Sequence, residues 1–213
     1  MRIIVDAYGG DNAPEAVLRG CRMAADQWKC EIILTGDGEK LRARAAELGV
    51  SLEGMTIAEA PDVFPMEAEP TAIMKQYKDS SMARGLQMLA EGGGEALVSA
   101  GSTGALLTGA TLLVKRVKGI RRAAMGPAMP NKAGGKTVIV DCGANAECTP
   151  EFLLQFGLVG SVYAKKQLGI ENPKVGLLNI GTEDSKGTAL QKEAYALLKN
   201  AGEKGLVNFV GNV

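Results

Sequence analysis

Glycine-rich turns that directly follow short apolar runs limit most strongly what this chain can fold into. In the stretch VSAGSTGALL (Val98–Leu107), an apolar run ends in small residues and a helix-forming segment starts at once. The same order of apolar run, turn and helix-forming segment returns several times along the 213 residues. Such alternation is typical of α/β proteins whose mostly parallel sheet carries helices on both faces. We therefore predict a single α/β domain over residues 1–213.

The apolar runs and the helix-forming segments set the expected order of elements. The runs RIIVDA, EALVSA and KVGLLNI are apolar on both faces, as central strands of a parallel sheet are. We expect strands at Arg2–Ala7, Glu31–Thr35, Met55–Ala58, Ala96–Ser99, Ala123–Ala128, Lys136–Asp141, Lys174–Asn179 and Leu206–Val210. We expect helices at Pro14–Trp28, Lys40–Leu48, Ser81–Glu91, Gly104–Val117, Pro150–Leu168 and Thr188–Asn200.

Local signals add detail to this order. Asn12 and Thr149 are residue types that cap helices, and each precedes a proline that suits a first helical turn. The segment Pro61–Pro70 is rich in proline and acidic residues, so we expect a loop that crosses the surface.

Composition excludes several classes of function. The net charge is zero, so nothing favours nucleic-acid binding. The chain has no histidine, which rules out a Ser-His-Asp or Cys-His mechanism within it and leaves proton transfer to Lys, Asp, Glu, Tyr or the substrate. The four cysteines form no CxxC pair, so we expect reduced thiols and no metal site. No apolar run approaches the roughly 20 residues that a membrane-spanning helix needs.

Four predicted strand ends carry small and polar residues: Asp6–Asn12, Ser99–Gly104, Asp141–Asn145 and Asn179–Gly187. In a parallel sheet these ends meet at one edge, where ligands bind. Backbone N–H groups freed by glycines, helix amino termini and hydroxyl groups all favour an anion, and Lys186 adds a full positive charge. Each turn alone is also explained as a tight strand-to-helix connection. The carboxylates of Asp6, Asp11 and Asp141 oppose an anion unless they are paired or orient donors.

The segment KRVKGIRR is the most basic stretch of the chain. Its five cations are Lys115, Arg116, Lys118, Arg121 and Arg122. At the end of a predicted helix, such cations complement the helix dipole and stay solvated. The alternative is a docking surface for an acidic partner.

Four motifs together resemble the bacterial phosphate acyltransferase family of phospholipid synthesis, the PlsX family. They are VDAYGGDNAP, EPTAIMKQYKDSSM, VSAGSTGALL with its continuation KGIRRAA, and the long stretch from DCGANAECTP to NIGTEDSKG. The resemblance implies transfer of a long-chain acyl group from an acyl carrier protein thioester to inorganic phosphate, which gives acyl phosphate. It implies a three-layer fold like that of the isocitrate and isopropylmalate dehydrogenases.

The resemblance carries further expectations. It implies no cofactor, a homodimer that works with acyl carrier protein, and a cytoplasmic location with peripheral membrane contact. Members of the family extend well beyond Val213. We therefore expect this chain to be part of a longer protein whose remainder completes the sheet and carries the membrane contacts.

The strand ends and the resemblance together define a predicted site. Catalytic roles are predicted for Asp141, Asn145 and Lys186. Binding of phosphate or the thioester substrate is predicted for Asp6, Gly9, Gly10, Asp11, Asn12, Lys78, Ser80, Ser81, Gly101, Ser102, Thr103, Gly104 and Asn179. Docking of the carrier protein is predicted for the five cations of the basic segment.

Two alternatives stay open at this point. One is a scaffold that binds phosphate or carrier protein without catalysis. The other is a phosphotransacetylase-like enzyme that uses coenzyme A thioesters. Dependence on the carrier protein separates the second alternative from the acyltransferase, and binding without product would identify the scaffold.

Overall fold

The computed structural model describes all 213 residues, and the chain divides into two compact units, Met1–Lys115 and Arg116–Val213. Strands pair only within a unit, and each unit has its own hydrophobic core. The units are therefore described one after the other.

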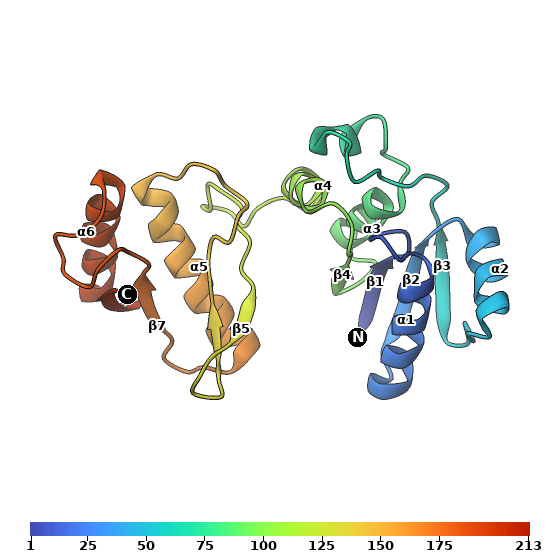
Figure 1. Cartoon of the computed structure of the whole chain (residues 1–213), viewed down its shortest axis with the longest axis horizontal. Helices are drawn as coiled ribbons and strands as arrows, with labels where there is room; N and C mark the ends of the chain where they lie inside the picture. The colour runs from blue at the N-terminus through green and yellow to red at the C-terminus, as the bar shows by residue number, and fades with distance from the viewer. The chain divides into compact units, whose positions relative to one another are not determined.

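The first unit is built on a four-stranded sheet in the order β3–β2–β1–β4, with every pair of strands parallel (Figure 1). Its strands are β1 (Arg2–Asp6), β2 (Glu31–Gly36), β3 (Met55–Glu59) and β4 (Ala96–Val98). Its helices are α1 (Glu15–Trp28), α2 (Gly38–Leu48), α3 (Ser81–Ala90), α4 (Thr103–Gly109) and the short turns η1 (Pro70–Met74) and η2 (Ala110–Val114).

Helices cover both faces of this sheet, which makes three layers. Val5, Ile32 and Leu34 pack against α1 and α2 in one core cluster. Side chains alternate along a strand, so Ile4 points to the opposite face, where Gly85 of α3 approaches it. The predicted three-layer α/β class is confirmed. Asp6 has the same parity as Ile4 and therefore lies on the face covered by α3.

Several details of the first unit differ from the sequence prediction. Pro14, not Asn12, occupies the cap position of α1, and Asn12 contributes only its backbone carbonyl, which accepts a hydrogen bond from Ala16. The segment from Pro61 to Glu69 is free of helix, as expected, but it does more than cross the surface. Phe64 is buried in it and packs edge-on against Tyr77, with ring centroids 5.2 Å apart.

The second unit contains two small sheets. A hairpin pairs β5 (Ala128–Pro130) with β6 (Lys136–Val138), and β7 (Lys174–Leu177) pairs in parallel with β8 (Asn208–Asn212). The helices are α5 (Pro150–Leu168) and α6 (Ala189–Glu203). In the core of this unit, Leu177 of β7 packs with Ala194 and Leu198 of α6, and Leu153 and Leu154 of α5 pack against them. Thr149 caps α5 as predicted, because its hydroxyl accepts the N–H of Phe152.

The predicted strand over Ala123–Ala128 is wrong in extent. The strand begins only at Ala128, because Met125 donates its N–H to the Asp141 carboxylate and accepts the N–H of Cys142. The strand is antiparallel to β6 because the connection Asn131–Gly135 is far too short for the crossover that a parallel pair needs. Gly134 takes a positive φ of 79° in that turn.

The strands predicted as central are only partly central. In the first sheet β1 and β2 have neighbours on both sides, whereas β4 is an edge strand and Val98 is 54% exposed. Ile180, which ends the run KVGLLNI, is 87% exposed. No helix of the chain combines the length and the apolar character that crossing a membrane requires.

Candidate functional site

A buried carboxylate at the end of β1 organises the glycine-rich turns of the first unit. Asp6 is 2% exposed. Its Oδ1 accepts the Ser81 hydroxyl at 2.5 Å and the Tyr8 N–H at 3.3 Å, and its Oδ2 accepts the Ser99 hydroxyl at 2.7 Å. Asp6 thereby connects the ends of β1 and β4 with the first turn of α3.

Glycines allow the turns after β1 and β4 to touch at this carboxylate. A Cβ on Gly9 would lie 2.6 Å from Asp6 Oδ2 and 2.9 Å from the Gly101 nitrogen, both closer than atoms can pack. Gly10 has a φ of 101° and faces Ala100. The predicted juxtaposition of Asp6, Gly9 and Gly10 with Gly101 therefore exists in the structure.

The turn after β4 leads into α4 with defined hydrogen bonds. Gly101 donates its N–H to the Ser99 hydroxyl oxygen at 3.1 Å, and the buried Ser102 caps the helix by accepting the Ala105 N–H at 3.4 Å. The N–H groups of Thr103 and Gly104 in the first helical turn have no acceptor within the chain, as is usual at a helix start. Of the predicted donors in this turn, Gly101 and Ser102 thus have structural partners.

The other predicted binding residues of the first unit differ in their exposure. Ser80 is fully buried and caps α3 by accepting the Ala83 N–H. Lys78, Asp11 and Asn12 are exposed. The structure therefore gives Ser80 a capping role, and the contacts of all four residues with a ligand remain predictions.

In the second unit, Asp141 and Asn145 form one tightly bonded loop. The Asp141 carboxylate accepts N–H groups from Met125 (2.7 Å), Ala144 (3.2 Å) and Asn145 (2.8 Å), and the Asn145 side-chain amide donates to it at 3.0 Å. Asn145 Oδ1 accepts Arg122 Nε at 2.5 Å. Both predicted catalytic residues thus hold the loop together.

These hydrogen bonds lower the pKa of Asp141. Partial burial raises its pKa, but the hydrogen bonds from Met125, Asn145 and Ala144 outweigh that effect and hold the pKa below its ordinary value. Asp141 is therefore ionised at neutral pH, so it is an acceptor and not a proton donor.

Asn179 and Lys186 belong to one loop that joins β7 to α6. The Asn179 amide donates to the Lys186 carbonyl at 3.1 Å, and the Asn179 oxygen accepts the Ile180 N–H. The Lys186 ammonium is exposed and lies 3.9 Å from the Glu183 carboxylate, a distant and solvated pair. Lys186 is thus the predicted catalytic residue whose charged group is most available to a ligand.

The basic segment Lys115–Arg122 is not helical, because the helical turns end at Val114. The helix-dipole interpretation therefore fits Lys115 alone. The backbone after it is held by Gln155 of α5, which accepts the Arg121 N–H at 2.8 Å and donates to the Gly119 carbonyl at 3.1 Å. Arg122 has a structural partner in Asn145.

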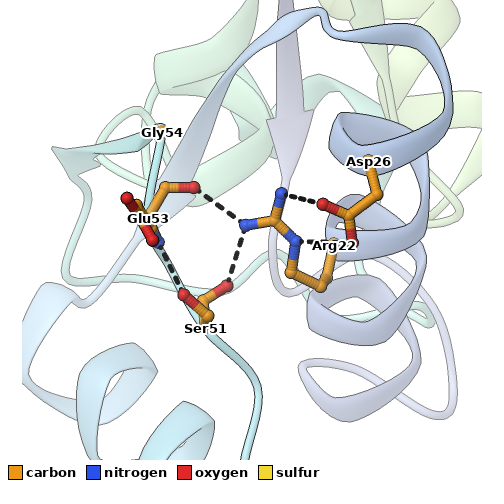
Figure 2. A pocket seen from close by; sticks show the side chains of 5 residues that line it. All are labelled: Arg22, Asp26, Ser51, Glu53 and Gly54. Carbon is orange, nitrogen blue, oxygen red and sulfur yellow. Dashed lines mark hydrogen bonds and ion pairs between the residues drawn. The ribbon is translucent and has the colours of Figure 1, made fainter.

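An open pocket lies at the amino-terminal end of the strands of the first sheet, beside the loop that precedes β3 (Figure 2). Arg22 of α1 occupies it and binds the Asp26 carboxylate with two nitrogens. Its third nitrogen donates to the carbonyls of Glu53, at 2.8 Å, and Ser51. The guanidinium thus links α1 to the loop before β3, and we assign this pocket a structural role. Gly54 also lines the pocket.

Hydrogen bonds bring predicted residues together in three places. One is the group on Asp6 in the first unit, and the others are the pairs Asp141–Asn145 and Asn179–Lys186 in two separate loops of the second unit. The group on Asp6 includes Ser99, which belongs to a predicted strand end but is not among the residues predicted to bind the substrate. Its position in the motif SAGSTG, directly after the strand, is the signal that could have found it. Convergence of all four strand ends on one ligand stays a prediction.

Comparison with known proteins places the chain among its relatives. The family model described as "Fatty acid synthesis protein" matches residues 1–213, the whole chain. The chain belongs to this family. Proteins named phosphate acyltransferase from Clostridium acetobutylicum and Acetivibrio thermocellus are 44% and 46% identical to it over all of its length. The predicted family is thereby confirmed. This member spans 63% and 62% of the length of those two relatives.

Solved structures support the fold of this family member. A phosphotransacetylase from Streptococcus pyogenes matches with a TM-score of 0.74 at 21% identity, over 100% of this chain and 68% of that one. A phosphotransacetylase from Staphylococcus aureus matches with a TM-score of 0.73 at 20% identity, over 99% of this chain and 67% of that one. At this identity the likeness concerns the fold alone, which agrees with the three-layer class.

Proposed function

We propose that the protein containing this chain is a phosphate acyltransferase that moves a long-chain acyl group from acyl carrier protein to inorganic phosphate. The observation that carries the proposal is the pair of glycine-rich turns joined on Asp6 at the carboxyl edge of the sheet. The chain that carries these turns is matched over its whole length by relatives named phosphate acyltransferase.

The reaction suits a chain without histidine. An oxygen of hydrogen phosphate attacks the thioester carbonyl carbon, and the carbon–sulfur bond breaks so that the carrier thiolate leaves. The proton that the phosphate group loses passes through water to the thiolate, which gives acyl phosphate and the carrier thiol. Phosphate is already an anion at neutral pH, so the step needs placement more than a general base. Correct placement of two reactants lowers a barrier by up to about 7–11 kcal/mol. A donor to the developing oxyanion contributes about 3 kcal/mol more.

The available groups divide between these two tasks. The exposed ammonium of Lys186 is suited to neutralise phosphate or the oxyanion. The N–H groups of Thr103 and Gly104 have no acceptor in the chain and are suited to donate to an oxygen of the substrate. Asp141 and Asn145 act by holding their loop in place. Acyl carrier protein is the proposed partner and a homodimer the proposed assembly.

The test is an assay with long-chain acyl carrier protein and phosphate that follows acyl phosphate by its hydroxylamine adduct. We expect phosphate-dependent product from the carrier thioester and little from the matching coenzyme A thioester. Equal turnover of the coenzyme A thioester would favour the phosphotransacetylase-like enzyme. Tight phosphate or carrier binding with no acyl phosphate would favour the scaffold.

A further inference from the structure

We propose that Asp6 is a positioning residue that acts on phosphate through Ser99 and does not itself touch the ligand. The proposal rests on the proposed function, because it concerns the same phosphate site. It departs from the sequence prediction, which places Asp6 among the residues that bind the substrate.

Burial and charge exclude Asp6 as a direct ligand. The residue is 2% exposed, and three donors from Tyr8, Ser81 and Ser99 already occupy its carboxylate. An ionised carboxylate only accepts hydrogen bonds, so it has nothing to donate to a phosphate oxygen. Direct contact with an anion would also bring two negative charges together in a buried place.

The hydrogen-bond directions show how Asp6 reaches the turn. Ser99 has one hydroxyl hydrogen, which points to Asp6 Oδ2 at 2.7 Å. Its oxygen is therefore free to accept the Gly101 N–H at 3.1 Å, and that bond closes the turn between β4 and α4. Gly9 packs against the same three groups, with no room for a Cβ. One carboxylate thus sets the conformation of both glycine-rich turns.

Replacing Asp6 with Asn leaves the size unchanged and removes one acceptor. If the amide oxygen stays with Tyr8 and Ser81, the amide nitrogen faces Ser99 and competes with Gly101 for the serine oxygen. The Ser99 hydroxyl then loses its fixed direction, and the turn loosens. Ser99→Ala removes the same link from the other side and adds no new polar atom.

The experiment measures binding of inorganic phosphate to the whole protein that contains this chain by calorimetry, at a temperature where circular dichroism shows each variant folded. We expect Asp6→Asn and Ser99→Ala each to weaken phosphate binding about tenfold. The double variant should bind no more weakly than Ser99→Ala alone, because both changes break one chain of contacts. In the amide NMR spectrum, the Gly101 signal should shift in Asp6→Asn before phosphate is added.

Thr35→Val is the matched control. Thr35 is fully buried in β2, where it is the register partner of Asp6. Its hydroxyl donates to the Val5 carbonyl at 3.3 Å and takes no part in the contacts that join Asp6, Ser99 and Gly101. The variant loses one buried hydrogen bond, whereas Ser99→Ala loses the two part-buried bonds to Asp6 and Gly101. Thr35→Val should therefore unfold more easily while phosphate binding changes less than about twofold. If Asp6→Asn does not fold, the phosphate affinity of Ser99→Ala, compared with that of Thr35→Val, still tests the proposal.

Three results would overturn the proposal: unchanged phosphate affinity in Asp6→Asn or Ser99→Ala, additive losses in the double variant, or an equal loss in Thr35→Val. Absence of phosphate binding by the unmodified whole protein overturns it as well. If the same protein forms no acyl phosphate but shows the expected pattern of phosphate binding, the proposed function is refuted and the role of Asp6 stays intact.

Discussion

At the scale of single residues, the site depends on small side chains and on one buried charge. Gly9 lets two turns meet, and Asp6 joins them by hydrogen bonds. Lys186 is the opposite kind of residue, because its ammonium is exposed and its ion pair with Glu183 is long. The sequence predicts all three positions. In the structure Gly9 and Asp6 shape the turns of the first unit, whereas the Lys186 ammonium of the second unit is exposed.

Gly9→Ala should strongly destabilise the first unit. The added methyl group would lie 2.6 Å from Asp6 Oδ2 and 2.7 Å from the Ser99 oxygen, so both turns have to move. Forced overpacking of this kind costs about 1–3 kcal/mol. Gly20→Ala is the control, since nothing lies within 4 Å of a Cβ there and alanine favours the helix α1. Denaturant unfolding should show a loss for the first variant and none for the second.

Lys186→Ala should abolish most acyl transfer in the whole protein and leave the circular dichroism spectrum unchanged. The reason is that the substitution removes the exposed cation but none of the backbone bonds that Asn179 makes in this loop. Glu183→Gln removes the partner of the ion pair, keeps the cation, and should retain activity. Near-normal turnover of Lys186→Ala would contradict a catalytic role.

At the scale of elements, loops are held by side chains that bond to backbone groups. The Asp141 loop is the clearest case, because one carboxylate collects N–H groups from two segments. These bonds replace the strand that the apolar pattern around Met125 predicts. A pattern of residue types can show where an apolar run lies, but it cannot show that a carboxylate sixteen residues away takes its backbone donors.

Asp141→Asn should lower the free energy of unfolding by about 2 kcal/mol at pH 7, the range of hydrogen bonds to a charged group. The pKa of Asp141 is lowered from its ordinary 3.8 in the folded protein. Its stabilising effect is therefore complete above that value and is lost as the pH falls through the lower, folded-state pKa. Unfolding curves of the two proteins should converge at acid pH. The exposed Glu171→Gln should show no such difference.

At the scale of the whole molecule, the chain has two units with separate cores, and the basic segment starts where the first unit ends. Gln155 and Asn145 hold this segment in the second unit. Surface cations held by an ordered backbone suit a negatively charged partner, and complementary charge mainly raises the rate of association.

Charge reversal in this segment should weaken use of the carrier protein. Arg116→Glu with Lys118→Glu should raise the Michaelis constant for acyl carrier protein several-fold and flatten its dependence on salt. The Michaelis constant for phosphate should stay the same. Lys192→Glu with Lys199→Glu on α6 is the control with an equal change of net charge. If both pairs behave alike, the segment has no docking role.

The sequence by itself determined the class of fold, the positions of most helices and strands, and the glycine-rich turns, because each depends on local periodicity and turn chemistry. It also determined the family, through motifs spread over the whole chain. Only the tertiary structure decided that β5 and β6 form a hairpin, that Gly101 and Ser102 already have partners, and that Asp6 is buried behind Ser99. These facts depend on which distant groups share hydrogen bonds, and one sequence carries no record of that pairing.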